Sequence, residues 1–306
     1  MKKIIVAGAT GFVGQFLVNA LLHQGYQVSV IGRSVEKIRH VFHDTVMATT
    51  WDALDEHHLQ DHYAIVNLAG ENIAQQRWST HFKQKILDSR VLPTQRLVAL
   101  CLSLKEKAPW LLNASAIGYY GLSGEYPDQP QPVDEQWQQP PHLKDFLSDV
   151  ARAWEGSAEP AVLANLPVTW LRFGVVLHPR GGMLKKLLPA IKFGLGSILG
   201  HGDQMISWIH IHDLIRAIVF ILEKPVYGAI NLTSPMPTTQ AHFMQVLAQR
   251  YQRRCYLRLP KLVIKMIFGE MGEALLLGGQ NVHPTRLQQE NFTFQYPRIE
   301  LVAHDL

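Results

Sequence analysis

The sequence predicts an α/β fold built on a doubly wound parallel sheet, followed by a smaller C-terminal domain. Over the first two-thirds of the chain, short apolar runs rich in β-branched residues alternate with stretches whose apolar residues recur at helical spacing. This alternation is typical of β-α-β units, which place parallel strands in one sheet and helices on both of its faces. Beyond Phe173 the pattern changes to glycine-rich segments and shorter elements. A chain of 306 residues is long enough to bury a core of this size.

The first strand, helix and second strand form the best-defined unit of the sequence. Residues 4–7 are a short apolar run, glycines follow with the spacing G-x-x-G-x-x-G, and helical periodicity begins at Phe12. Residues 27–31 return to a strand pattern. Such a turn lets the backbone approach a pyrophosphate, and the helix N-terminus turns free N–H groups toward it. The alternative is a tight turn without a ligand. We expect a Rossmann-type dinucleotide site with contacts from Gly8, Thr10, Gly11, Phe12, Val13 and Gly14.

The end of the second strand predicts which dinucleotide binds. NAD-binding proteins of this type carry Asp or Glu about 20 residues after the glycines to hold the ribose 2′-hydroxyl, whereas NADP-binding proteins offer Arg. The sequence here reads Gly32-Arg33-Ser34, and the first carboxylate is Glu36. Arg33 can make a charge-assisted contact to a 2′-phosphate, and Ser34 can donate a hydrogen bond. We therefore expect NADP; the alternative is that Arg33 is a solvated loop cation.

Four more strands are predicted in this region, at residues 46–50, 64–70, 110–114 and 168–173. Helical periodicity covers residues 80–104 and 143–163 between them. Ligands of open α/β sheets bind at the carboxyl ends of the strands. The fourth strand runs there into Leu68, Ala69 and Gly70, which are small or apolar, and the fifth runs into Ser115 to Gly121.

The remainder of the chain is predicted to cover the cofactor crevice. Glycines between residues 181 and 202 flank a helix at 183–193, and a strand at 207–211 leads into an apolar helix at 213–222. A further strand and helix are expected at 229–232 and 243–251. We expect residues 1–176 and 206–225 to form the NADP-binding domain. Residues 177–205 and 226–306 are then the smaller cap on the substrate side.

Composition excludes several other classes of protein. The net charge of +4 and the pI near 9.0 are mildly basic, but no run of Lys or Arg suggests a nucleic-acid partner. No stretch approaches the roughly 20 apolar residues of a membrane span, so no membrane partner is expected. Cys101 and Cys255 are too few for a disulfide framework, which favours a reducing, cytoplasmic location. The oligomeric state is left open.

With these segments in view, the chain resembles the extended short-chain dehydrogenase/reductases. Within them it is most similar to the nucleoside-diphosphate-sugar epimerase-like proteins that carry a C-terminal domain of unknown function. The first motif is typical of the whole superfamily, whereas NLAGEN, SAIGYYG and SWIH together are specific to the subfamily. The matching segments are 8–14 (GATGFVG), 67–78 (NLAGENIAQQRW), 89–91 (SRV), 115–121 (SAIGYYG), 172–177 (RFGVVL), 194–202, 207–213 (SWIHIHD), and 278–280 (GGQ) with Pro284.

The resemblance implies an NADP cofactor and a set of residues around it. Gly32 and Arg33 are expected near the 2′-phosphate, and Leu68 and Ala69 along the cofactor. Glu71 and Arg90 are expected near the dinucleotide, and the backbone of Val175 and Val176 beside the nicotinamide. For Arg90 the alternative is an exposed helix cation, and for Glu71 a loop or helix-cap carboxylate.

The catalytic pair of the superfamily is where the sequence departs from it. Catalytic members use Tyr-x-x-x-Lys on a helix, which stacks both side chains on one face, and the ammonium lowers the phenol pKa for proton transfer. A Glu usually follows four residues after the Lys. Aligning Glu155 with this Glu places Leu147 and Ala151 at the Tyr and Lys positions. Neither side chain can move a proton.

Other proton donors must therefore come from the neighbouring segments. The candidates are Ser115, near the serine of the superfamily, Tyr120, and His210, whose side chain ordinarily titrates nearest neutrality. Their alternatives are a strand-end hydroxyl, a packed aromatic ring and a structural hydrogen bond. His210, His212 and Asp213 together could suggest a metal site, but without another ligand at a typical spacing we expect none.

Two functions are consistent with this pattern. The first is an NADP-dependent oxidoreductase or epimerase-like enzyme that acts on a small sugar-like or carbonyl substrate without the usual Tyr–Lys pair. The second is an NADP-binding sensor or interaction protein with negligible turnover. The substrate pocket of the first is expected between residues 115–120 on one side and residues 183–202 and 207–210 on the other.

Overall fold

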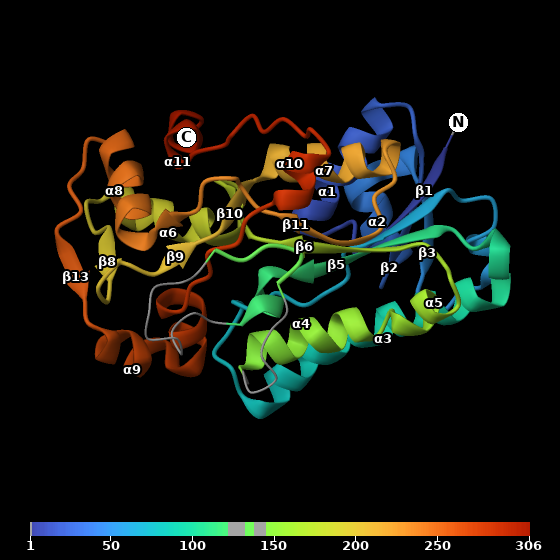
Figure 1. The fold of residues 1–306 in the computed structure, drawn as a ribbon, viewed down its shortest axis with the longest axis horizontal. Helices are drawn as coiled ribbons and strands as arrows, with labels where there is room; N and C mark the ends of the chain where they lie inside the picture. Colours follow the sequence, from blue (N-terminus) through green and yellow to red (C-terminus); the bar gives the residue numbers. More distant parts are fainter. Residues whose placement is uncertain (1, 122–131, 138–144) are drawn as a thin grey trace.

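The computed structural model describes residues 2–121, 132–137 and 145–306, and its ribbon shows a layered α/β architecture with an appended cap (Figure 1). The helical periodicity predicted at 143–163 is present as two helices, residues 146–156 and 159–163, with a turn between them; residues 143 and 144 lie outside the described part of the chain.

A seven-stranded parallel sheet forms the centre of the molecule, in the order β11-β6-β5-β4-β1-β2-β3. The chain order reverses between β1 and β4, the switch point where open α/β sheets bind ligands. This confirms the predicted Rossmann-type doubly wound fold. The strands are β1 (Lys3–Ala7), β2 (Gln27–Gly32), β3 (Met47–Thr50), β4 (Ala64–Asn67), β5 (Trp110–Ala116), β6 (Val168–Phe173) and β11 (Gly228–Leu232).

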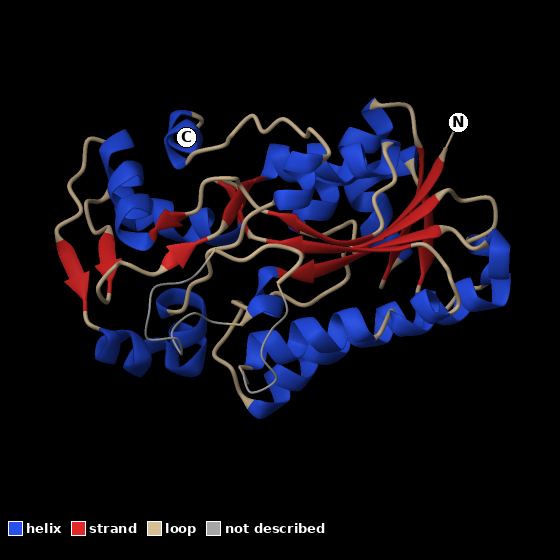
Figure 2. Ribbon diagram, in the orientation of Figure 1, coloured by secondary structure: helices blue, strands red, loops and turns tan. Residues whose placement is uncertain are grey.

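Helices cover both faces of the sheet (Figure 2). Alternate residues of a strand point to opposite faces, so Ile4 and Val6 pack in one core and Ile5 and Ala7 in the other. One face carries α1 (Phe12–His23), α2 (Val35–Phe42) and α7 (Ile211–Glu223). The other carries α3 (Thr80–Leu104), α4 (Phe146–Gly156) and α5 (Glu159–Leu163). Short helical turns are η1 (His43–Thr45), η2 (Glu56–His58), η3 (Lys105–Lys107), η4 (Ile117–Tyr120) and η6 (Glu273–Leu277).

The cap has its own apolar core, to which Trp208, Phe243, Leu188 and Val302 contribute. Its strands are short and pair two by two: β7 (Val175–His178) with β10 (Trp208–His210), β9 (Met205–Ile206) with β12 (Thr238–Thr239), and β8 (Ser197–Leu199) with β13 (Leu257–Leu259). Its helices are α6 (Gly182–Lys192), α8 (Gln240–Arg250), α9 (Lys261–Gly272) and α11 (Ile299–His304). Among the described residues, no helix has the length and apolar character needed to cross a bilayer.

The predicted range of the cap needs two corrections. The prediction places residues 206–225 in the NADP-binding domain, yet Trp208 is buried in the core of the cap. Strand β11 lies beyond residue 226, yet it hydrogen-bonds to β6 as an edge strand of the main sheet. The segment around α10 (Thr285–Gln289) also serves the main domain, because Leu287 and Phe292 are buried in the core beneath α7. Both segments fall within the sequence range predicted for the cap but pack in the main domain, because the chain leaves the cap twice to contact the sheet and its helices. The rest of the predicted division stays a prediction.

An added methyl group at Gly14 tests how tightly α1 is held against the preceding turn. An ideal Cβ at Gly14 would lie 2.6 Å from both the Cα and the carbonyl oxygen of Ala9, so the backbone would have to shift. We expect Gly14→Ala to lower the free energy of unfolding by roughly 1–3 kcal/mol, the usual cost of overpacking. Chemical denaturation of both proteins measures the difference.

Gly156→Ala is the matched control. Gly156 ends α4, and no atom lies within 4 Å of an ideal Cβ there. An alanine at this helical position should be neutral or stabilise the protein by up to about 1 kcal/mol. Equal losses of stability in the two variants would contradict the close contact at Gly14.

Candidate functional site

The turn between β1 and α1 lies against the end of β4 so closely that it requires glycine. Gly8 has a φ of +74°, and an ideal Cβ on it would stand 2.6 Å from the carbonyl oxygen of Leu68. Leu68 is fixed in turn, because its N–H donates to the carbonyl of Ala7 at 2.9 Å. The two chain segments thus meet at the switch point with no side chain between them.

The N-terminus of α1 opens from this turn without a side-chain cap. The first N–H groups of any α-helix have no hydrogen-bonding partner within the helix. Gly11, the N-cap of α1, has no side chain that could accept from them. These donors, together with the positive end of the helix dipole, suit a pyrophosphate. The residues present therefore fit a dinucleotide, and the predicted contacts of Thr10, Phe12 and Val13 belong to this first turn.

The end of β2 presents a cation and a hydroxyl, as expected from the sequence. Arg33 is exposed, and the Ser34 hydroxyl caps α2 by accepting the N–H of Lys37 at 3.2 Å. Its own hydrogen remains available to donate. Gly32 is also constrained, since an ideal Cβ there would lie 3.0 Å from the Cδ1 of Ile38.

A buried amide cluster holds the turn after β4 in place. Asn67 accepts the N–H of Ala69 through Oδ1 at 3.2 Å. Its Nδ2 donates to Asn113 Oδ1 at 2.7 Å and to Thr94 Oγ1 at 3.0 Å. All three polar side chains of the cluster are fully buried, so each needs the other two as hydrogen-bonding partners. The position of Leu68 and Ala69, where the cofactor is expected, depends on this cluster.

Arg90 anchors the next part of the same loop. Its guanidinium donates to the carbonyl of Glu71 at 3.0 Å and to that of Ile86 at 2.9 Å. It lies 5.0 Å from the ring centre of Trp154 and packs against Gly70. Burial lowers the pKa of Arg90 to about 10. Arg90 is therefore not the exposed helix cation of the alternative; its contact with a dinucleotide stays a prediction.

The carboxylate of Glu71 is neutralised by a neighbouring lysine. Lys85 Nζ lies 3.1 Å from Glu71 Oε2, and this hydrogen bond lowers the pKa of the carboxyl group. Arg33 lowers it further, though by less. The negative charge of Glu71 is thus balanced within the protein, so this carboxylate would repel a nearby anionic cofactor less than an unpaired one would.

The helix face where the superfamily carries Tyr and Lys is apolar in this chain. Leu147 packs on Gly118, with 3.4 Å between its Cβ and an ideal Cβ on that glycine, and Ala151 is 1% exposed. Val175 and Val176, expected beside the nicotinamide, are half-buried on β7. The two positions on α4 therefore provide packing and no proton relay.

Ser115 and Tyr120 lie in one buried hydrogen-bonded network. The Ser115 hydroxyl donates to Glu155 Oε1 at 2.6 Å, and both Glu155 oxygens accept from Arg172 at 2.8 Å. Arg172 Nη1 donates to the Tyr120 hydroxyl at 2.9 Å, which donates to Asn231 Oδ1 at 2.7 Å. Burial raises the pKa of Tyr120 to about 12. Each group is engaged with another protein group.

The sequence interpretation missed the centre of this network. Glu155 and Arg172, which the sequence motifs do not connect, form an ion pair that is almost completely buried. The available signal was a charged residue in the otherwise apolar run of β6, since a buried arginine needs a partner. Asn231 carries no such signal, because its place beside Tyr120 depends on the pairing of β11 with β6.

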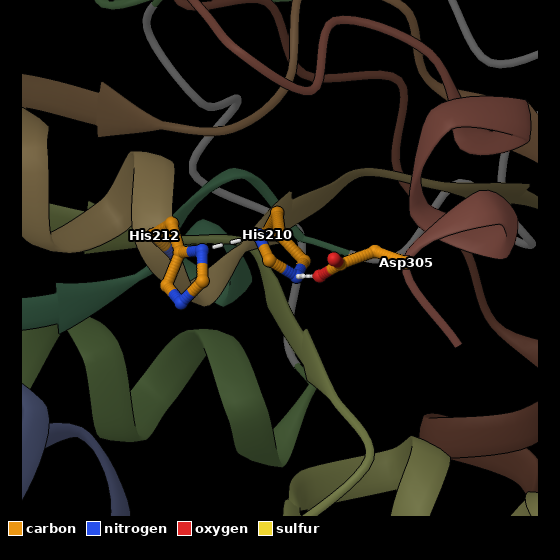
Figure 3. A group of neighbouring side chains, drawn as sticks. All are labelled: His210, His212 and Asp305. Atoms are coloured by element: carbon orange, nitrogen blue, oxygen red, sulfur yellow. Dashed lines mark hydrogen bonds and ion pairs between the residues drawn. The ribbon is translucent and has the colours of Figure 1, made fainter.

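His210 belongs to a different cluster. It ends β10 and caps α7, because its Nδ1 accepts the N–H of His212 at 3.4 Å. Its ring stacks on Tyr296 with 3.8 Å between the ring centres. Figure 3 shows the ring between His212 and Asp305, whose carboxylate lies 3.5 Å from Nε2. Burial, together with a smaller effect of His212, lowers the pKa of His210 to about 4. The expectation that His210 titrates near neutrality is wrong.

The same cluster does not favour a metal ion, although ligand atoms of His210, His212 and Asp305 lie within 4.8 Å of one another. A neutral imidazole has one lone pair, and His210 uses it at Nδ1 to accept a backbone N–H. The proton then sits on Nε2, the nitrogen that faces Asp305. Asp213, the acid considered from the sequence, is fully buried and accepts N–H groups of Gln295 and Tyr296 instead.

The pKa of His210 predicts an acid-side loss of stability. Because this pKa is lower in the folded protein than the ordinary value near 6.5, the unfolded chain takes up the proton first as the pH falls. The stabilising effect of the neutral ring is fully present above about pH 6.5 and is lost progressively toward pH 4. Denaturant unfolding across this range measures it.

His210→Asn is the informative comparison, because asparagine can cap a helix and does not titrate. The stability difference between wild type and variant should be constant above about pH 6.5 and move in favour of the variant below it. A difference that stays constant down to pH 4 would show that His210 does not carry this proton uptake.

Comparisons with known proteins agree with this geometry. Residues 4–233 match the model of the NAD dependent epimerase/dehydratase family, and residues 259–306 match a domain of unknown function, DUF1731. An epimerase family protein of Mycobacterium bovis is 36% identical over 301 residues, covering 97% of this chain and 94% of that protein. An epimerase family protein of Staphylococcus saprophyticus is 33% identical over 308 residues, covering 100% and 99%.

A solved structure is similar over the same length. The human epimerase family protein SDR39U1 (isoform 2) with NADPH has a TM-score of 0.84 and 29% identity, covering 99% of this chain and 98% of that one. The matches extend across both the sheet and the cap, and they confirm the resemblance that the sequence motifs indicated. The chain belongs to the NAD dependent epimerase/dehydratase family and carries the DUF1731 domain at its C-terminal end.

Proposed function

We propose that the chain is an NADP(H)-dependent oxidoreductase or epimerase-like enzyme that acts on a small sugar-like or carbonyl substrate. The observation that carries the proposal is the glycine turn at the switch point of the sheet. There the close approach of Gly8 to Leu68 leaves no room for a side chain. The N-terminus of α1, which has no side-chain cap, can donate its free N–H groups to a pyrophosphate. The human relative with NADPH supports the same cofactor.

The preference for the phosphorylated dinucleotide rests on the end of β2. Arg33 is exposed at the position where NAD-binding proteins carry an acid, and the hydroxyl hydrogen of Ser34 is free to donate. Glu71 lies near enough to Arg33 for the guanidinium to lower the pKa of its carboxyl group, but the charge of Glu71 is already balanced by Lys85. The net local charge therefore favours an anionic 2′-phosphate over a neutral 2′-hydroxyl.

The chain's own residues would hold and shield the reactants. When bound, NADP(H) supplies or accepts a hydride at the nicotinamide ring. Val175 and Val176 would lie beside that ring, and the cap, built from α6 and the strands around it, would exclude water from it. The proposed substrate site lies between residues 115–120 and the cap segments 183–202 and 207–210. No step runs through the Tyr–Lys relay of the superfamily, because Leu147 and Ala151 occupy its positions.

A second candidate function is an NADP-binding sensor or interaction protein with negligible turnover. One observation favours it: the hydroxyls of Ser115 and Tyr120, the proton donors expected from the sequence, are buried and engaged with Glu155, Arg172 and Asn231. Single-turnover assays separate the two candidates. NADPH labelled with deuterium at C4 would be incubated with a panel of small carbonyl compounds; label in a product supports the enzyme, and none across the panel supports the sensor.

Replacing Arg33 tests the cofactor preference. Wild type should bind NADPH more tightly than NADH, because a charge-assisted contact to the 2′-phosphate contributes on the order of 1.5–3 kcal/mol, roughly ten- to a hundredfold in affinity. Arg33→Ala should lose most of this difference while its affinity for NADH stays the same. Calorimetric titration of both cofactors measures it.

Arg39→Ala provides the matched control, since Arg39 is also exposed and lies on the adjoining helix α2. It should bind both cofactors as wild type does. Equal wild-type affinities for NADPH and NADH would disprove the proposed selectivity.

Removing the Tyr120 hydroxyl separates structure from catalysis. Tyr120→Phe leaves Arg172 Nη1 and Asn231 Oδ1 without this partner, so we expect a loss of roughly 1–3 kcal/mol in the free energy of unfolding. If Tyr120 is structural, hydride transfer in the single-turnover assay should be unchanged within a fewfold range. Denaturation and the isotope assay on the same protein give both readouts.

Tyr119→Phe is the control for this experiment. The Tyr119 ring stacks on the Arg172 guanidinium at 3.5 Å, and the substitution keeps the ring. It should alter neither stability nor hydride transfer. A hundredfold slower transfer in folded Tyr120→Phe, with Tyr119→Phe normal, would identify Tyr120 as the proton donor.

A further inference from the structure

The outer end of the cap exposes many large apolar side chains. We call residues 192–195 and 254–268 the cap-end surface. Phe193 is 82% exposed, Tyr256 74%, Met266 70% and Leu262 68%. The other exposed apolar side chains of this surface are Leu195, Leu257, Leu259, Ile267 and Phe268. An apolar area of this extent is unusual on a surface that faces only water, and it indicates a contact with another molecule.

Strand pairing and a hydrogen bond place the two segments side by side. Strand β13 runs beside β8, with Leu257 opposite Ser197 and Leu259 opposite Leu199. The guanidinium of Arg253 donates to the carbonyl of Lys192 at 3.0 Å, which brings the loop at 192–195 beside the start of β13. Helix α9 follows directly after Pro260, and Figure 1 shows β13 and α9 at the same outer end of the molecule.

Most of the large apolar side chains of helix α9 are exposed to solvent. Ile264 and Gly272 are its buried residues, whereas Leu262, Met266 and Ile267 are turned to solvent. An apolar helix of a globular protein normally buries such residues against a neighbour. The exposed side of α9 therefore lacks a partner within the described part of the chain.

The charge of the same region is strongly one-sided. No Asp or Glu occurs between Glu223 and Glu270. The basic residues near the cap-end surface in this stretch are Arg250, Arg253, Arg254, Arg258, Lys261 and Lys265. Lys265 pairs with Glu273 at 2.9 Å. Arg254, Arg258 and Lys261 have no acidic partner among residues 2–121, 132–137 and 145–306. The partner that complements this surface is therefore both apolar and negatively charged.

A second copy of the chain fits this requirement poorly. Two copies would use the free edge of β13, which is exposed along its length, and a twofold axis would run it antiparallel to itself. Arg258 is the middle residue of β13, so it would face its own copy directly. Like charges opposite each other destabilise a strand pair.

A lipid surface fits better than a protein. Protein partners are usually anchored in pockets, whereas lipid chains adapt to side chains that protrude. The largest apolar side chains of the cap-end surface protrude in this way, since Phe193, Tyr256, Leu262 and Met266 are each more than two-thirds exposed. Apolar side chains flanked by Lys and Arg are typical of proteins that lie in the interface of a negatively charged membrane, and tyrosine is favoured at that depth.

We propose that the cap-end surface binds the surface of an anionic phospholipid membrane. Leu262, Met266 and Phe193 enter the boundary between headgroups and chains, while Arg254, Arg258 and Lys261 contact the headgroup phosphates. This proposal departs from the sequence-based expectation of no membrane partner, which was argued from the lack of a membrane-spanning stretch; the proposed surface contact needs no such stretch. It is independent of the proposed NADP chemistry, which lies at the carboxyl edge of the sheet.

The test is sedimentation of the full chain with vesicles of phosphatidylcholine alone and of phosphatidylcholine mixed with phosphatidylglycerol. We expect binding to the mixed vesicles only, and weaker binding at high salt. Each Lys or Arg near an anionic surface contributes about 1 kcal/mol, so Arg258→Gln with Lys261→Gln should weaken binding about thirtyfold. Leu262→Gln with Met266→Gln should weaken it at least tenfold.

Leu163→Gln is the matched control, because Leu163 is 76% exposed on α5, outside the cap-end surface. It should bind as wild type does. NADPH affinity and circular dichroism should be unchanged in every variant, which excludes misfolding. The proposal would be overturned if wild type failed to bind the mixed vesicles. It would also be overturned if both double variants bound these vesicles as tightly as wild type does. So would a concentration-dependent dimer in analytical ultracentrifugation that Leu262→Gln with Met266→Gln abolishes.

Discussion

The close approach of Gly8 to the carbonyl of Leu68 is the constraint on which the carboxyl edge of the sheet depends. Ala7 is in register with both Ile31 and Asn67, so the ends of β1, β2 and β4 reach the same level. Only a residue without a Cβ allows the turn after β1 to lie on the turn after β4. The turns after β1 and β4 are therefore in contact, and Arg33 at the end of β2 is close enough to Glu71, in the loop after β4, to lower the pKa of its carboxyl group.

The neighbouring strand ends are held by polar groups that serve each other. Ser115 and Arg172 are paired residues of β5 and β6, and Glu155 from α4 bridges them. In a low-dielectric interior, removing one member of such a pair leaves an uncompensated charge. The network therefore fixes α4 to the sheet. Ala151, which the sequence resemblance places at a position of the superfamily's proton relay, is buried on this helix.

Local patterns predicted the parts of the structure that depend on local physics. The glycine turn, the first two strands and the bounds of α3 at Thr80 and Leu104 follow from spacing and periodicity, and the structure confirms them. The surroundings of Tyr120 did not follow, because Arg172 and Asn231 lie 52 and 111 residues away in the chain. The pKa of His210 could not be predicted for the same reason, since Asp305 and Tyr296 meet it only in the folded chain. Strand β11 looked like part of the cap because its sequence does not specify its neighbour, β6.

The return of the chain to the main domain also determines when its core can be completed. Leu287 and Phe292 close the apolar layer over α7, and the Phe292 ring meets that of Phe220 at 5.5 Å between centres. Synthesis delivers α7 about seventy residues before these partners, with the cap segments in between. During translation, that side of α7 must remain uncovered, or be covered by another group, until residues 287–292 have left the ribosome. Residues 4–233, which match the family model, are thus synthesised before Leu287 and Phe292, and they cannot complete their core without them.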